Sequence, residues 1–304
     1  MTSILYPKTV PVPEGLEIFF EGKSHPRFDV GSPYEDLGLP WKLRKKLDLS
    51  DDRTYRVLYP DCDHSGGVYR IGVDGSSPDS GHSLICEGED RETGIFHFSG
   101  DAVVAPVRYR DGMGRRLAIV LRTRDCVPIL LYDASADTIA VVHLSNQTEF
   151  GYDPNKPFMG PILKRVMEIL NPATTYVFIG PAIGGAQSKC NCYGYTETPS
   201  QLDGSRLKQK IETLYSIDLC KRGVIDTKKS PGKMIFRWGW LMLLILESLG
   251  VPWPQVDTSC NFCTRCDPGR FYSYRDNRKM MGLNKETNQS EKLRLGNLSV
   301  VKIK

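Results

Sequence analysis

The sequence predicts a mixed α/β (α+β) fold, namely a single-domain sandwich of mixed sheets with flanking helices. Its 304 residues, 40% of them hydrophobic, are enough to bury a full core. Short runs rich in Val, Ile and Leu succeed one another through the middle of the chain, and helical patterns come after them. This mixture of strand runs and helices favours one mixed domain.

Strand patterns begin at residues 55–73, where two strands flank a loop that contains Cys62 and His64. The next segment, 74–98, is dominated by Gly, Ser and Asp, so we expect an insertion or a long loop there. A strand running into a Gly/Pro loop is expected at 174–185. Between these segments, four closely spaced strands are predicted at 101–109, 116–124, 127–133 and 138–144.

The spacing of apolar residues predicts helices at 41–49, 157–170, 205–217 and 237–249. The last of these is apolar on nearly all sides, which favours a buried helix. Its uninterrupted apolar part, 240–246, is far shorter than the ~20 residues that span a bilayer. No membrane partner is therefore expected.

We expect the chain to divide into an N-terminal extension or first lobe (1–50), a main domain (51–290) and a C-terminal tail (291–304). A net charge of +4 with only short basic runs is not typical of nucleic-acid binding. The first residues lack the apolar region of a secretory signal. The nine cysteines, an odd number, then indicate a reducing compartment, so a cytoplasmic protein is expected.

Three residues that could carry chemistry are His64, Cys126 and His143, each at a strand end or in an adjoining loop. Taken singly, each is more often a buried structural residue than a functional one. Together, two imidazoles and a thiolate can bind zinc and leave a fourth position open for water or substrate. The same residues also suit a metal-free hydrolase with Cys126 as nucleophile and His143 as base. The separations in sequence do not decide between these hypotheses.

The chain resembles the YfiH family of laccase-domain proteins, which are similar to zinc-dependent purine nucleoside phosphorylases. The family patterns Gln-x-His-Gly-x-x-Val, Ala-Asp-Ala-Leu-Val, Thr-Ala-Asp-Cys-Leu-Pro-Val and Val-His correspond, in order, to residues 62–68, 100–104, 123–129 and 142–143. Towards the C-terminus, IGPAIGG (179–185) and the CNFC to MMGL segment (260–283) match further family motifs. The resemblance covers about 55–285, so the main domain is expected to be YfiH-like.

The resemblance implies one zinc ion bound by His64, Cys126 and His143, which would then form the catalytic centre. It implies phosphorolysis of adenosine, inosine, guanosine and methylthioadenosine, with deamination of adenosine as a further activity. The expected partners are thus a purine nucleoside and phosphate, with Arg275 and Arg44 as candidate substrate-binding residues. Copper is the alternative metal because it binds such donors more tightly than zinc.

Some positions depart from the family pattern. After His143 the chain reads Leu-Ser-Asn-Gln-Thr in place of Ala-Gly-Trp-Arg-Gly, Ser65 replaces a Gly, and Asp36 replaces an Asn. These departures support an alternative, a catalytically impaired zinc-binding homologue. The five histidines of the chain are too few for a laccase with several coppers, each bound largely by imidazole.

A second group of cysteines could hold a structural zinc ion. Cys260, Cys263 and Cys266 form a C-x-x-C-x-x-C run, and Cys190 and Cys192 lie in the Gly-rich loop region. The resemblance instead makes Cys260 and Cys263 ordinary core positions. An iron–sulfur site is disfavoured because the fourth Cys and the Pro after it are missing.

Overall fold

The computed structural model of the protein describes residues 4–22, 54–62, 64–72, 86–90, 95–153, 155, 158–188, 192, 194–196, 204–220, 223–226, 233–271, 273 and 296–304. The predicted helix at 41–49 and the candidate substrate-binding residues Arg44 and Arg275 lie outside these residues. So does Cys190.

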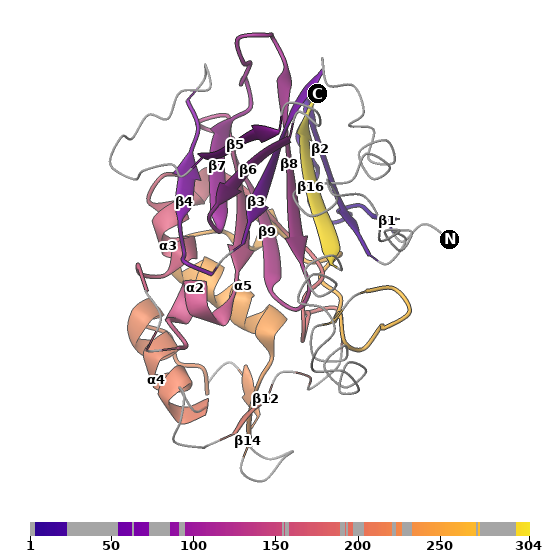
Figure 1. Ribbon diagram of the computed structural model, residues 1–304. Coiled ribbons are helices and arrows are strands. Elements are labelled where there is room, and N and C mark those ends of the chain that lie inside the picture. Colours follow the sequence, from indigo (N-terminus) through magenta and orange to yellow (C-terminus); the bar gives the residue numbers. More distant parts are fainter. Residues whose placement is uncertain are drawn as a thin grey trace, which may run out of the picture.

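The first sheet brings both ends of the chain together (Figure 1). Strand β16, near the C-terminus, pairs antiparallel with β2 on one side and with β8 on the other. Within the described residues the strand order is β1 (Ile4–Leu5), β2 (Leu16–Glu21), β16 (Asn297–Ile303), β8 (Arg116–Thr123), β3 (Tyr55–Asp61), β6 (Ile95–Ser99) and β5 (Cys86–Asp90).

The second sheet contains three of the four strands that the sequence predicts in the middle of the chain, or parts of them. Its order in the described residues is β15 (Val256–Asp257), β11 (Thr175–Ile179), β9 (Val127–Asp133), β10 (Thr138–Leu144), β7 (Ala102–Pro106) and β4 (Val68–Arg70). The fourth predicted strand, at 116–124, is β8 of the first sheet. A small third sheet is formed by β12 (Gly194–Thr196), β14 (Lys233–Phe236) and β13 (Ile225–Asp226).

The two large sheets pack face to face, and the alternation of side chains along each strand explains how. On β8, Leu117, Ile119 and Leu121 belong to the core between the sheets, whereas Ala118 and Val120 lie on the opposite face. Both faces of β8 are thus apolar and buried. This agrees with the unbroken Val/Ile/Leu pattern from which the strand was predicted.

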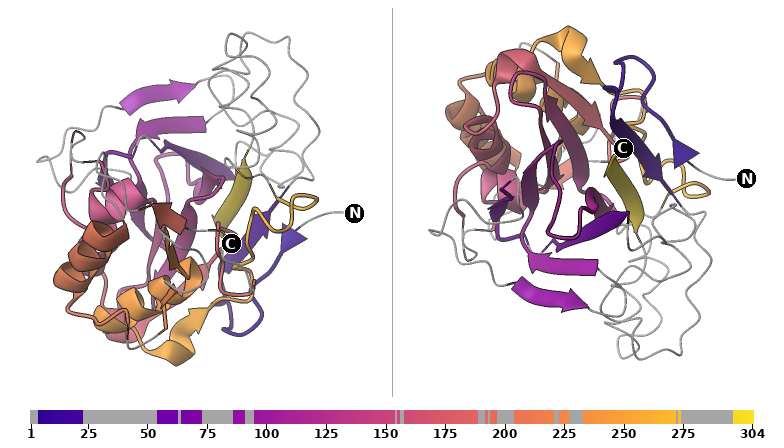
Figure 2. Two further views of the ribbon diagram at one scale, coloured as in Figure 1. Left: turned by 90° about the horizontal axis from the view of Figure 1, so that it is seen from below. Right: turned by 90° about the horizontal axis from the view of Figure 1, so that it is seen from above.

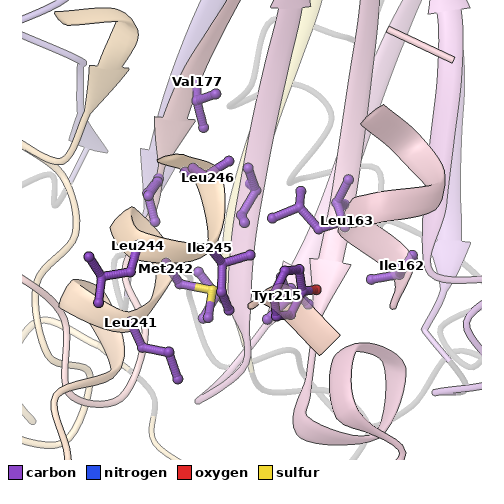
Figure 3. Close-up of a cluster of buried hydrophobic side chains, with 14 of the residues drawn as sticks. Ile162, Leu163, Val177, Tyr215, Leu241, Met242, Leu244, Ile245 and Leu246 are labelled. Carbon is purple, nitrogen blue, oxygen red and sulfur yellow. The ribbon is translucent and has the colours of Figure 1, made fainter. Parts of the chain in front are cut away.

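The helices cover the other face of the second sheet, on the side away from β1 and β2 (Figure 2). Helix α5 has no capping side chain at its N-terminus, so packing must stabilise it. Leu241, Ile245 and Leu246 are fully buried against this layer (Figure 3), and each such side chain contributes about 1.5–3 kcal/mol. Within the described residues the helices are α2 (Asn146–Phe150), α3 (Ile162–Met167), α4 (Gly204–Tyr215) and α5 (Trp238–Ser248), with 3₁₀ turns at Pro172–Thr174 and Trp253–Gln255.

Two of the predicted elements differ from the structure. The predicted loop at 74–98 is wrong where β5 and β6 form, because pairing with β3 overrides the local Gly/Ser/Asp composition. The predicted helix at 157–170 is shorter, since Pro161 occupies its N-cap position. The C-terminal tail contains a fully buried seven-residue strand, β16.

The mixed two-sheet sandwich with flanking helices is the predicted fold class. The division into three segments stays a prediction, although strands from all three share the first sheet. None of the helices in the described part of the chain has the length and apolar character needed to traverse a bilayer.

Candidate metal centre

The three candidate ligands meet at one end of the second sheet. His143 lies near the end of β10, and Cys126 directly precedes β9. The antiparallel register pairs Leu144 with Val127, which brings these two chain positions to the same edge. His64 lies in the loop that leads into β4, whose neighbour β7 pairs in turn with β10. The sheet therefore assembles residues that lie far apart in sequence.

One donor atom from each of His64, Cys126 and His143 lies within 4.8 Å of the other two. We call these residues the His–Cys cluster. Cys126 Sγ is 3.8 Å from His64 Nε2. The centroids of the two imidazole rings are 4.9 Å apart, and the ring planes are inclined at 64°. A tetrahedral zinc about 2.3 Å from sulfur and about 2.1 Å from nitrogen would hold these atoms about 3.6 Å apart. The donor set and its spacing thus fit the metal that the resemblance implies.

Asp101 organises both histidines, and the sequence analysis gave it no role. Its fully buried carboxylate accepts a hydrogen bond from His143 Nδ1 at 2.8 Å. It also accepts from the backbone N–H groups of His64 at 3.2 Å and of Gly66 at 2.8 Å. A carboxylate on Nδ1 leaves Nε2 of His143 as the metal-binding nitrogen. The available signal was an Asp at the start of an apolar strand, because a buried carboxylate needs such partners.

The backbone of His64 is strained. Its φ angle is 63°, in the left-handed region that residues other than glycine rarely adopt. Such a conformation costs about 1–3 kcal/mol and persists where surrounding contacts enforce it. Here the contact is the carboxylate of Asp101, which holds the His64 N–H. Strain of this kind is concentrated at binding sites, in agreement with a ligand role for His64.

The electrostatics of the cluster favour a thiolate. Burial opposes ionisation of Cys126, but the charge of His143 and hydrogen bonds from His143 and His64 outweigh it and lower the pKa to about 6. Burial likewise opposes protonation of His143, yet the charges of Cys62 and Cys126 and the Asp101 hydrogen bond raise its pKa well above 6.5. Since metals bind the thiolate form, Cys126 is prepared as a ligand or as a nucleophile.

Cys62 is a second thiol at this site that sequence reasoning missed. Its Sγ lies within 4.8 Å of an Asp101 oxygen and a His143 ring nitrogen. Burial raises its pKa, against an opposing effect from His143. The only signal was its alignment with the Gln of the family pattern, which gives no reason to expect a thiol beside the metal position.

The segment after His143 forms the start of a helix. Ser145 caps α2, accepting a hydrogen bond from the Thr148 backbone N–H at 3.1 Å, and Thr148 Oγ1 accepts from the Ser145 N–H at 2.9 Å. Where the family pattern has Ala-Gly-Trp-Arg-Gly, this chain thus forms a capped helix start. From the neighbouring α3, Arg165 Nη1 donates to the Gly66 carbonyl at 2.6 Å.

The structure brings part of the second group of cysteines together. Cys192, Cys263 and Cys266 each have a sulfur within 4.8 Å of the other two. We call these residues the thiol cluster. Cys260 is a buried core residue outside the cluster, as the family resemblance implies and contrary to the zinc hypothesis, and burial raises its pKa to about 11.

Comparison with known proteins identifies the family. Residues 99–285 match the model of a family described as multi-copper polyphenol oxidoreductase laccase. The chain belongs to this family. The match spans β7, β9 and β10 together with Cys126 and His143. It confirms the predicted relationship to the laccase-domain proteins.

Solved structures of this laccase-domain type share the fold. YlmD from Geobacillus stearothermophilus has a TM-score of 0.59 at 18% identity, covering 96% of this chain and 93% of that one. The Neisseria meningitidis protein NMB0706 gives 0.58 at 16%, covering 99% of each chain. Bacillus licheniformis YfiH gives 0.56 at 19%, covering 95% and 93%. A search of curated proteins finds no match.

Proposed function

We propose that this protein is a zinc-dependent purine nucleoside phosphorylase that uses the His–Cys cluster. Its substrates would be adenosine, inosine, guanosine or methylthioadenosine together with phosphate, and adenosine deamination would be an additional activity. The observation that carries the proposal is the convergence of His64, Cys126 and His143 at zinc-like spacing, with Asp101 behind His143. Membership of the laccase-domain family agrees with an enzyme.

The roles of the chain's own residues follow from the geometry. Asp101 keeps a proton on His143 Nδ1 and so directs Nε2 at the metal position. Cys126 supplies a negative charge at neutral pH because its pKa is about 6. When bound, zinc supplies a Lewis acid that can polarise an oxygen of the substrate. Three protein donors leave a fourth position for that contact.

Phosphate needs a cationic partner, and we assign this role to Arg165 alongside the candidates Arg44 and Arg275. Arg165 is half-buried and donates one guanidinium N–H to Gly66, two residues after His64. A guanidinium has five N–H donors in a fork that matches phosphate geometry. Arg165 would thus take over from the arginine that the family carries after its second histidine.

The decisive experiment is elemental mass spectrometry of the purified protein beside Cys126→Ser. The exposed Cys220 provides a matched control, since Cys220→Ser removes a thiol without touching the cluster. We expect Cys126→Ser to lose about one zinc per chain and all phosphate-dependent nucleoside cleavage, while Cys220→Ser loses neither. An unchanged zinc content in Cys126→Ser would contradict the proposal, and copper in place of zinc would redirect it to the alternative metal.

The second candidate is a metal-free Cys/His hydrolase. The observation in its favour is the series Cys126, His143 and Asp101, in which an oriented imidazole adjoins a thiol of lowered pKa. Amide or ester hydrolysis that survives chelation of the metal but disappears in Cys126→Ser would support it. Zinc bound at full occupancy without nucleoside turnover would instead indicate the catalytically impaired homologue.

A further inference from the structure

We propose that the thiol cluster of Cys192, Cys263 and Cys266 is a second metal site, occupied by a structural zinc ion. This site is separate from the His–Cys cluster and does not depend on nucleoside chemistry. It lies where the loop after β11 meets the loop after β15. Thiolate sulfur is the donor that selects zinc among the common biological divalent cations.

The three sulfurs are close enough to share one ion. The Sγ atoms of Cys192 and Cys266 are 3.2 Å apart, and all three sulfurs lie within 4.8 Å of one another. A tetrahedral zinc about 2.3 Å from each sulfur would set them about 3.8 Å apart. Binding would therefore require Cys192 Sγ and Cys266 Sγ to separate by about 0.6 Å, and three sulfurs would leave one position for a fourth ligand.

Cys263 is the fixed member of the cluster. It is fully buried, and its sulfur accepts a hydrogen bond from the Gly184 backbone N–H at 3.2 Å. Its own N–H donates to Ser188 Oγ at 2.8 Å. A backbone N–H directed at a sulfur stabilises negative charge there, as partners behind metal ligands do. The Cys263 sulfur thus has a partner of the kind that supports a metal-bound thiolate.

The two loops are held together independently of the cysteines. A β-bridge joins Ala182 to Cys263, and hydrogen bonds run from Ala182 N–H to Phe262 O and from Thr264 N–H to Ala182 O. At Gly185 the approach is so close that a Cβ atom would lie 2.3 Å from the Asn261 carbonyl oxygen. The backbone thus presents Cys263 before any ion binds, which reduces the ordering cost of binding.

Burial is graded across the cluster, and this favours a metal over a disulfide. Cys263 is buried, Cys192 is intermediate and Cys266 is exposed, so an ion could enter from the Cys266 side. A disulfide would join only the sulfurs of Cys192 and Cys266, at about 2.05 Å. It would not account for the hydrogen bond from the Gly184 N–H to the Cys263 sulfur. A reducing compartment, as the cysteine usage predicts, further disfavours a disulfide.

The test uses the full chain in a Cys126→Ser background, so that any remaining zinc cannot belong to the His–Cys cluster. We expect about one zinc per chain there, surrounded by sulfur at about 2.3 Å in X-ray absorption. Adding Cys192→Ser and Cys266→Ser should remove that zinc. Adding Cys260→Ala should leave it in place, because Cys260 is a neighbouring buried cysteine outside the cluster.

Thermal unfolding with and without a chelator provides the folding control. Zinc that binds only the folded chain raises Tm, so chelation should lower the Tm of the Cys126→Ser protein but not of the variant that also lacks Cys192 and Cys266. The proposal is overturned if Cys126→Ser protein reconstituted with zinc retains none. It is equally overturned if only nitrogen and oxygen atoms coordinate the zinc. A Cys192–Cys266 disulfide in peptides from cells whose free thiols were alkylated before any reduction would overturn it too.

Discussion

The His–Cys cluster and the thiol cluster both gather three side chains that could bind a metal ion, but they are built differently. The His–Cys cluster stands on the ends of strands in one sheet, with a buried carboxylate behind it. The thiol cluster stands on two loops joined by backbone hydrogen bonds, with its sulfurs running from buried to exposed. The first construction fixes the orientation of each donor, as catalysis requires, whereas the second fixes how two loops meet.

The hydrogen-bond partners of the candidate ligands therefore distinguish the two kinds of site better than the ligands themselves do. Asp101 holds a ring nitrogen and two backbone N–H groups at once, including that of the strained His64. Behind the thiol cluster the corresponding partner is a backbone N–H, that of Gly184. A side-chain partner can be mutated on its own, so the comparison can be tested experimentally.

The largest effect should come from Asp101→Asn. An amide cannot accept all three hydrogen bonds, and with its N–H₂ group towards His143 it favours the tautomer that protonates Nε2 and blocks the metal. We expect zinc affinity at the His–Cys cluster to fall about 10–100-fold, while the thiol cluster keeps its zinc. Titration of the protein against a competing chelator measures both affinities.

The matched control for this substitution is Asp125→Asn. Asp125 adjoins Cys126, but its carboxylate accepts from Thr264 Oγ1 at 2.8 Å. We expect both affinities to stay unchanged in this variant. Equal losses in Asp101→Asn and Asp125→Asn would mean that general disturbance of the sheet edge, and not orientation of the histidines, governs binding.

A change of pH should have an intermediate effect on folding stability, and the effect should have opposite signs for a carboxylate near each cluster. Burial raises the pKa of Glu149, on the helix after His143, from 4.5 to about 7. Glu149 therefore holds its proton more tightly in the folded state than in the unfolded state, and the stability that this contributes is lost as pH rises through about 7.

At Asp257, ahead of the thiol cluster, burial is outweighed by hydrogen bonds from Ser259, Val10 and Thr9 that lower the pKa. That stability is lost as pH falls through the lowered value.

Denaturant unfolding between pH 5 and pH 8 measures the Glu149 contribution, because Asp257, with its lowered pKa, stays ionised over this range. The Glu149 contribution should reduce the unfolding free energy by about 2 kcal/mol over this range, and Glu149→Gln should remove that slope. Gln can still bond the Leu163 N–H and the Tyr215 hydroxyl, which the carboxylate contacts now. Asp257→Asn should leave the slope intact. It should lower the unfolding free energy at pH values above the pKa of Asp257. A slope that persists in Glu149→Gln would refute the assignment.

Sequence reasoning could predict the mixed fold from local patterns, whereas the candidate metal ligands were identified through the family resemblance. The apolar runs at 127–133 and 138–144 became β9 and β10 with the same bounds, and His64, Cys126 and His143 do converge. Strands β5 and β6 were missed because their backbone pairing with distant β3 decides their conformation. No local pattern contains that information.

The hydrogen-bond partners of the candidate ligands could not be predicted from the sequence for the same reason. Asp101 and His143 lie 42 positions apart and meet only through the register of β7 and β10. The cysteine pattern suggested Cys260 as a ligand, but the loop geometry turns it into the core and recruits Cys192. Spacing along the chain therefore predicts which residue types are present, and the strand and loop pairings decide which of them meet.

The smallest effect should come from Cys62→Ala, and it bears most directly on the comparison. The Cys62 sulfur groups with Asp101 and His143, whereas Cys126 groups with both histidines. If Cys62 is only a neighbour, its loss should change zinc affinity by less than about threefold, as the chelator titration would show. A loss as large as that in Cys126→Ser would make Cys62 a fourth ligand. A closed Cys₂His₂ set is the structural type of zinc site. The thiol cluster, with three sulfurs and an exposed side, would then be the more open of the two.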